Sequence, residues 1–244
     1  MTSELNPRKS PSLIQEIYLG SLGILLVLGL LKHAQGRVPL VGDYAGTIAA
    51  GVQLYVPLLL VGYLGITRKS LGLSRDHLLK DFGLAAFLCL LTIIPFAIGH
   101  HYWQTSFNGR SFAFALPTEF AYSIVVQFLA VALPEELFFR GYLLQRMSQR
   151  WPIRGLNQKG LGGLCQGVKT CLLSKAVLVS SLVFAFAHFV GEYRIDRLAT
   201  FFPALVFAYL RLKTGRLLAP VTYHAFCNLL SELVYASYRG TPNS

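Results

Sequence analysis

The sequence predicts an all-α fold: a polytopic transmembrane helical bundle of about seven spans with an intramembrane cavity. Of its 244 residues, 54% are hydrophobic and only 14% are charged, and the mean hydropathy is +0.52. A soluble domain usually carries about 25% charged residues, and a disordered chain needs low hydrophobicity, so the composition excludes both classes. The apolar residues also cluster in stretches near the roughly 20 residues that a helix needs to cross a bilayer. A few charged residues interrupt one stretch, which indicates a helix that faces a polar interior.

The expected spans follow from the apolar stretches, and the loops between them contain the Gly, Pro and charged residues typical of turns. They lie at about 13–31, 44–66, 82–100, 119–146, 172–190, 197–211 and 217–238. We divide this single membrane domain into N-terminal transmembrane helices over 1–118 and catalytic helices over 119–244. The first span follows basic residues as a signal peptide would. However, Lys32 and His33 stand where a cleavage site needs small side chains, so we expect a retained anchor.

The basic charge of the chain is interpreted as a topology signal. The net charge is +11, from 22 Lys and Arg against 11 Asp and Glu. In a soluble protein this excess would suggest nucleic acid, but no aromatic-interleaved basic motif is present, and we expect no nucleic-acid partner. With a cytoplasmic N-terminus, about 15 Lys and Arg residues fall in inside segments and about six in outside segments. The sequence therefore predicts an integral membrane protein with its N-terminus in the cytoplasm.

Three charged residues lie together in the fourth expected span, in the segment FLAVALPEELFFRGYLLQ. Glu136 and Arg140 are four residues apart with the acid first, the favourable order for an ion pair on one helix face. Glu135 is rotated by about 100° from Glu136, so it is free to face a cavity. Pro134 removes a backbone hydrogen bond and favours a kink that admits water. A buried ion pair that only fixes helix packing is the alternative, but it needs one glutamate rather than two.

Two later spans also contain polar residues at helical spacing. Phe184 and His188 are four residues apart near the end of the fifth span, and His224 and Asn228 are four apart in the seventh. Taken singly, such residues are often interfacial groups or bridges between helices. Glu232, one turn after Asn228, is either a partner of this group or an interfacial residue.

Taken together, the polar residues of these spans suit hydrolysis in a sheltered site. A carboxylate can take a proton from water, and imidazole can hold that water or carry its proton. An imidazole N–H and an amide NH₂ can stabilise an oxyanion. The sequence lacks GxSxG, a paired Asp–Gly motif and HExxH, so it does not indicate a serine, aspartyl or site-2-type zinc protease.

The ordered motifs EExxxR, FxxxH and HxxxN resemble those of the CAAX-prenyl-protease and bacteriocin-processing family, also called the Abi family. Here they read Glu135-Glu136-x-x-x-Arg140, Phe184-x-x-x-His188 and His224-x-x-x-Asn228, within residues 119–238. The resemblance implies a glutamate-dependent intramembrane endopeptidase with a conical bundle and a cavity open to cytoplasm or lipid.

The resemblance also implies a role for each matching residue. Glu135 with His188 would activate water, and His224 with Asn228 would form the oxyanion hole. Glu136 and Arg140 would support the site, and Phe184 would pack beside it. The implied partner is a membrane-associated protein or peptide substrate in the lipid bilayer, cleaved in maturation or sorting. The small size favours a bacterial protein of the cytoplasmic (inner) membrane.

Three alternatives remain open. We expect no cofactor and no metal, but two His and one Glu would suit a zinc-dependent variant of the protease. A non-catalytic membrane immunity or interaction protein of the same fold would bind a peptide without cutting it. A proton-coupled transporter would also place carboxylates in the membrane, although we find no inverted repeat in the sequence.

Overall fold

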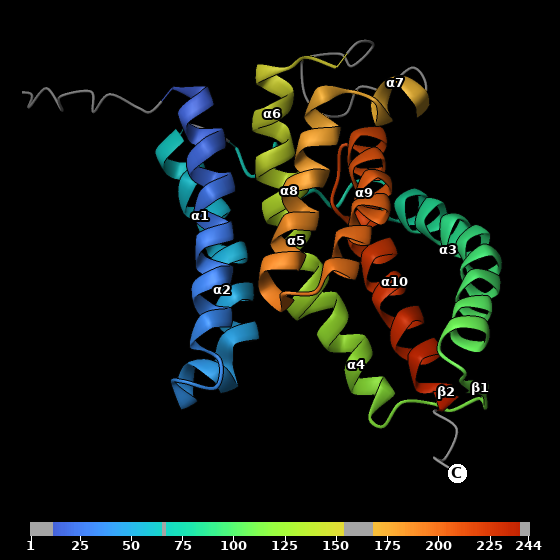
Figure 1. Ribbon diagram of the computed structural model, residues 1–244. Coiled ribbons are helices and arrows are strands. Elements are labelled where there is room, and N and C mark those ends of the chain that lie inside the picture. The colour runs from blue at the N-terminus through green and yellow to red at the C-terminus, as the bar shows by residue number, and fades with distance from the viewer. Residues whose placement is uncertain (1–11, 65–66, 154–167, 240–244) are drawn as a thin grey trace, which may run out of the picture.

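The computed structural model describes residues 12–64, 67–153 and 168–239, and it confirms an all-α bundle (Figure 1). The α-helices are α1 Leu13–Ala34, α2 Pro39–Leu64, α3 Leu78–Tyr102, α4 Phe120–Val126, α5 Leu133–Glu136, α6 Leu144–Arg150, α7 Val168–Leu172, α8 Lys175–Glu192, α9 Phe201–Thr214 and α10 Leu218–Ala236. The π-helical segments are η1 Trp103–Phe107, η2 Gln127–Ala132 and η3 Leu137–Leu143, and η4 Ile195–Thr200 is a 3-10 helix. The short strands β1 Ser111–Phe112 and β2 Tyr238–Arg239 pair antiparallel.

Membrane-spanning length is reached by several helical stretches of the described residues. By length and composition, Leu13–Ala34, Leu78–Phe107, Phe120–Arg150 and Lys175–Glu192 are the four that can cross a membrane. The expected span at 197–211 differs from this pattern, because it begins as η4 and continues as the 14-residue α9. At 1.5 Å per residue α9 extends about 21 Å, short of a hydrocarbon core of about 30 Å. The total of seven spans therefore stays a prediction.

The stretch from Phe120 to Arg150 is one helix in which the backbone changes type four times. It runs through α4, η2, α5, η3 and α6. Pro134 lies in α5, between the two π-helical segments, and has no N–H for an α-helical bond. Wider π turns are rare and are frequently found at functional sites. Figure 1 shows the helix changing direction near α5, as the proline predicted.

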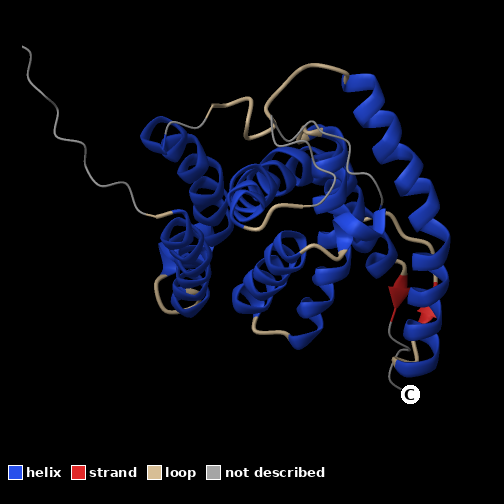
Figure 2. Cartoon of the chain, turned by 90° about the horizontal axis from the view of Figure 1, so that it is seen from above, coloured by secondary structure: helices blue, strands red, loops and turns tan. Residues whose placement is uncertain are grey.

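The remaining helices surround this stretch. In Figures 1 and 2, α1 and α2 form a pair at one side and α3 lies at the other. Helix α1 packs on α2 and α8, α2 packs on α5 and η3, and α3 packs on α10. The fully buried aromatic side chains Phe138, Phe139, Phe184 and Phe207 come from η3, α8 and α9. The core therefore lies among the helices that carry the sequence motifs.

Two ion pairs connect distant helices near the ends of the bundle. The Arg146 guanidinium of α6 donates two hydrogen bonds to the buried Glu16 carboxylate of α1. The Arg216 guanidinium, in the turn before α10, donates two bonds of 2.6 Å to the buried Asp81 carboxylate of α3. These bonds from Arg216 raise the pKa of its guanidinium above the usual value. The Arg216–Asp81 pair is bidentate, whereas both Arg146 bonds go to one oxygen of Glu16, and each pair fixes one peripheral helix to the centre of the bundle.

The loop between α2 and α3 enters the bundle and meets a buried arginine. Arg211 of α9 is fully buried and donates to the Ser70 carbonyl oxygen over 2.7 Å. Gly72 has φ +88°, and a Cβ there would lie 2.9 Å from the Arg211 Cζ atom. The Leu217 N–H donates to the Gly72 carbonyl oxygen. Leu71 and Gly72 of this loop are thus packed in the interior, and glycine is favoured at 72 by both conformation and space.

Candidate active site

A buried charged triad brings α5, η3 and α10 together. Glu136, Arg140 and His224 are 0%, 1% and 2% exposed. Glu136 Oε1 lies 3.1 Å from Arg140 Nη1 and 2.8 Å from His224 Nδ1. The predicted i, i+4 ion pair is therefore present, and its carboxylate also fixes an imidazole from a helix 88 residues further along the chain.

Aromatic rings pack around the guanidinium of Arg140. Its Cζ atom lies 4.1 Å from the Phe184 ring centroid and 5.1 Å from that of Phe207. Its Nη2 donates to the Ala204 carbonyl oxygen over 3.3 Å. Phe207 also stacks on the His224 ring, with centroids 4.6 Å apart and planes at 15°. Phe184 packs beside the site as expected, and this cation–π environment stabilises a buried positive charge.

Glu135 lies between the two histidines. Its Oε2 atom is 3.8 Å from Nε2 of His188 and 3.8 Å from Nε2 of His224. That oxygen is buried and has no hydrogen-bond partner, while the Glu135 side chain as a whole is 16% exposed. Contacts of this length are too long for direct hydrogen bonds but suit one bridging water. Residues from three expected spans thus meet at one carboxylate oxygen.

The hydrogen bonds of the two imidazoles decide which ring nitrogen is protonated. His188 Nδ1 lies 3.1 Å from the Phe184 carbonyl oxygen, which can only accept, so Nδ1 carries the proton. In neutral His188, Nε2 is then an acceptor directed at the Glu135 side. His224 Nδ1 likewise donates to the Glu136 carboxylate. The other ring nitrogen of His224, Nε2, therefore faces Glu135 at 3.8 Å.

Asn228 is held apart from the charged triad. Its Nδ2 donates to Oε1 of Gln127, in η2, over 2.8 Å. Glu232, one turn further along α10, accepts a 2.9 Å bond from Ser123 of α4. The structure therefore gives Glu232 a hydrogen-bonding partner outside the catalytic group. It places Asn228 on α10 one turn after His224, without a direct contact to Glu135.

The two histidines and Glu135 are the side chains of the site that a metal ion would need as ligands. Within the described residues, no group of three or more His, Cys, Asp and Glu side chains is arranged to hold a metal. We therefore derive no step through zinc.

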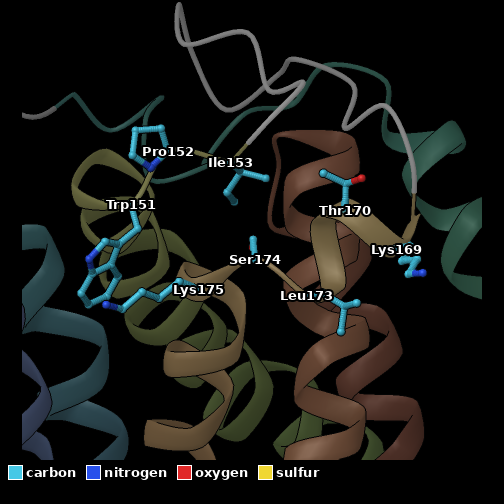
Figure 3. Close-up of a pocket in the computed structure, with 8 residues that line it drawn as sticks. All are labelled: Trp151, Pro152, Ile153, Lys169, Thr170, Leu173, Ser174 and Lys175. Carbon is cyan, nitrogen blue, oxygen red and sulfur yellow. The ribbon is translucent and has the colours of Figure 1, made fainter.

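A pocket of about 410 Å³ lies at the end of α6 and the start of α8, and Figure 3 shows Trp151, Ile153 and Ser174 among its lining residues. None of the predicted site residues lines it.

Residues 117–230, which carry the three motifs, match the family described as type II CAAX prenyl endopeptidase Rce1-like. The matched segment is just under half of the chain. The match agrees with the resemblance drawn from the motifs and supports, at the family level, a CAAX-type intramembrane protease. No curated protein and no solved structure matched the chain.

Sequence reasoning missed three partners of the residues in this site. Gln127 holds Asn228, Phe207 stacks on His224, and the Ala204 carbonyl accepts from Arg140. The only available signal was a lone glutamine in an apolar span, and polar residues in membrane helices commonly bond across helices. The phenylalanine and the carbonyl left no signal, because aromatic residues and backbone groups occur in every span.

Proposed function

We propose that this protein is a glutamate-dependent intramembrane endopeptidase that hydrolyses a peptide bond of a membrane-associated protein or peptide. The observation that carries the proposal is the Glu135 Oε2 atom, which is buried without a hydrogen-bond partner and lies 3.8 Å from both histidine Nε2 atoms. Buried carboxylate oxygens normally have partners, and an orphan atom between two imidazoles suits a reacting water.

Glu135 and His188 would activate the attacking water. The separation of 3.8 Å lets one water bond to Glu135 Oε2 and His188 Nε2 at once. Both atoms accept hydrogen bonds, since the His188 proton is on Nδ1. Glu135 takes one proton as the water oxygen bonds to the substrate carbonyl carbon, and it then gives this proton to the leaving amide nitrogen as the C–N bond breaks.

Asn228 and His224 would stabilise the oxyanion of the tetrahedral intermediate. For this role His224 would donate from Nε2 while its Nδ1–H is held by Glu136. Asn228 has a second N–H beside the one that Gln127 accepts. Loss of one such donor typically slows an acyl-transfer enzyme about 100- to 1,000-fold.

Cleavage of a membrane-anchored reporter peptide by purified protein in liposomes tests the proposal. Glu135→Gln and His224→Ala should each lower kcat at least about 100-fold. Glu192→Gln is the matched control, because Glu192 pairs with Arg197 outside the site and its loss should leave cleavage unchanged. Wild-type rates in Glu135→Gln would refute the proposal. Protection of cells by that variant would instead indicate a non-catalytic immunity protein.

Further experiments test whether the protein needs a metal ion and which substrate it cleaves. Chelator treatment should leave kcat unchanged, and a loss that added zinc restores would favour the zinc-dependent variant. Reporters with and without a prenylated CAAX end show whether the lipid is needed. Comparison of new protein termini in cells with wild type and with Glu135→Gln would identify the natural substrate.

We also propose a cytoplasmic N-terminus and a bacterial inner-membrane location, supported by the distribution of Lys and Arg. Reporter domains fused to each terminus test this orientation. An active cytoplasmic reporter at the C-terminus as well as at the N-terminus would contradict seven spans.

A further inference from the structure

We infer that Gln127 is a positioning residue that orients the Asn228 amide toward the oxyanion. This inference rests on the proposed function, because it assigns Gln127 a task only if Asn228 acts on the substrate. Its basis is the 2.8 Å hydrogen bond from Asn228 Nδ2 to Gln127 Oε1, which joins residues 101 positions apart.

An unrestrained asparagine is poorly suited to an oxyanion hole. Its terminal torsion is broad and roughly two-fold, so the amide can present either NH₂ or the carbonyl oxygen to the substrate. The carbonyl oxygen would repel a developing negative charge. An acceptor placed on the NH₂ side removes this ambiguity, because it bonds only the nitrogen end.

Gln127 provides that acceptor. Its Oε1 takes one Asn228 N–H and leaves the other N–H available. Both side chains are half-buried, so their hydrogen bond is partly shielded from competing polar groups. With Gln127 in the orientation that the structure shows, the substrate-side N–H is held before reaction, which is the condition for electrostatic stabilisation without reorganisation.

The π-helical segment η2 places Gln127 against α10. Gln127 is its first residue, and η2 packs on α10, where the bond between Gln127 and Asn228 joins the two. One turn away, Ser123 donates to Glu232 over 2.9 Å and links the same two helical stretches. That second bond does not touch Asn228, so the two bonds can be tested separately.

The test measures kcat and KM for the reporter peptide in matched variants. Gln127→Met keeps the length but removes the acceptor, and it should lower kcat about ten- to 100-fold with KM within about twofold. Gln127→Glu keeps an acceptor oxygen and should recover most of the rate. Ser123→Ala, which removes the neighbouring bond between the same helical stretches, should cleave at the wild-type rate.

A double variant distinguishes positioning from general packing. With Asn228→Ala already present, Gln127→Met should cause no further loss of kcat, because the amide it orients is gone. Losses that multiply, or a Gln127→Met enzyme as fast as wild type, would overturn the inference while leaving the proposed function intact. If Asn228→Ala itself cleaves at the wild-type rate, the oxyanion role of Asn228 fails and the inference fails with it.

Discussion

Removal of the Arg140 guanidinium is expected to destabilise the protein severely, because it leaves a buried carboxylate short of its main counter-charge. In Arg140→Met the apolar stem still fills space beside Phe184, but Glu136 keeps only its bond to His224. Glu136 has 0% exposure, so water cannot replace the lost partner.

The magnitude follows from the burial of both groups. Breaking a buried ion pair by deleting one partner costs about 3–5 kcal/mol. For a chain of this size each kcal/mol corresponds to about 2–4 °C, so the midpoint of thermal unfolding should fall by about 6–20 °C. The measurement is thermal unfolding in detergent at fixed protein and detergent concentrations.

The double variant Glu136→Gln with Arg140→Met provides the control. It removes both charges, and His224 can still donate to the glutamine oxygen, so it should recover most of the lost stability. An Arg140→Met protein that is no less stable than this double variant would refute the view that the uncompensated carboxylate causes the loss.

Two other substitutions test how the loops and α3 are fixed to the bundle. Gly72→Ala should destabilise by about 1–3 kcal/mol, because φ is +88° and the new Cβ would lie 2.9 Å from Arg211 Cζ. Gly83→Ala, which has no atom within 4 Å of its new Cβ, should be tolerated in the same unfolding assay. Asp81→Asn should lose about 1.5–3 kcal/mol from its two bonds with Arg216, and hydrogen exchange should show faster opening of α3 if this is right.

The elements predicted from local spacing agree best with the structure. Glu136 and Arg140 pair as their four-residue separation predicts. His188 and His224 both lie near Glu135. The motifs predicted this grouping, because each histidine is a polar residue in an apolar helix. The proline likewise predicted the change of direction in the fourth span.

Features that depend on pairing between distant segments were not predictable. The role of Gln127 depends on its hydrogen bond with Asn228, 101 residues away, and a single sequence does not show that the two residues are in contact. The protonated nitrogen of His224 depends on Glu136, a partner from another helix. The number of spans stays a prediction, because hydropathy alone does not give helix length, and a short helix such as α9 can be as apolar as a longer one.

Because η2 is π-helical, the stretch from Phe120 to Arg150 is sensitive to the number of residues in this segment. Each π turn accommodates more residues than an α turn, so a single deletion within Gln127–Ala132 would favour ordinary α-helix. Every residue before the deletion would then rotate by about 100° relative to Glu135. Ser123 and Gln127 would leave the surface of α10 together, although none of the catalytic side chains had been altered. A length change of one residue is therefore expected to be more damaging here than most substitutions.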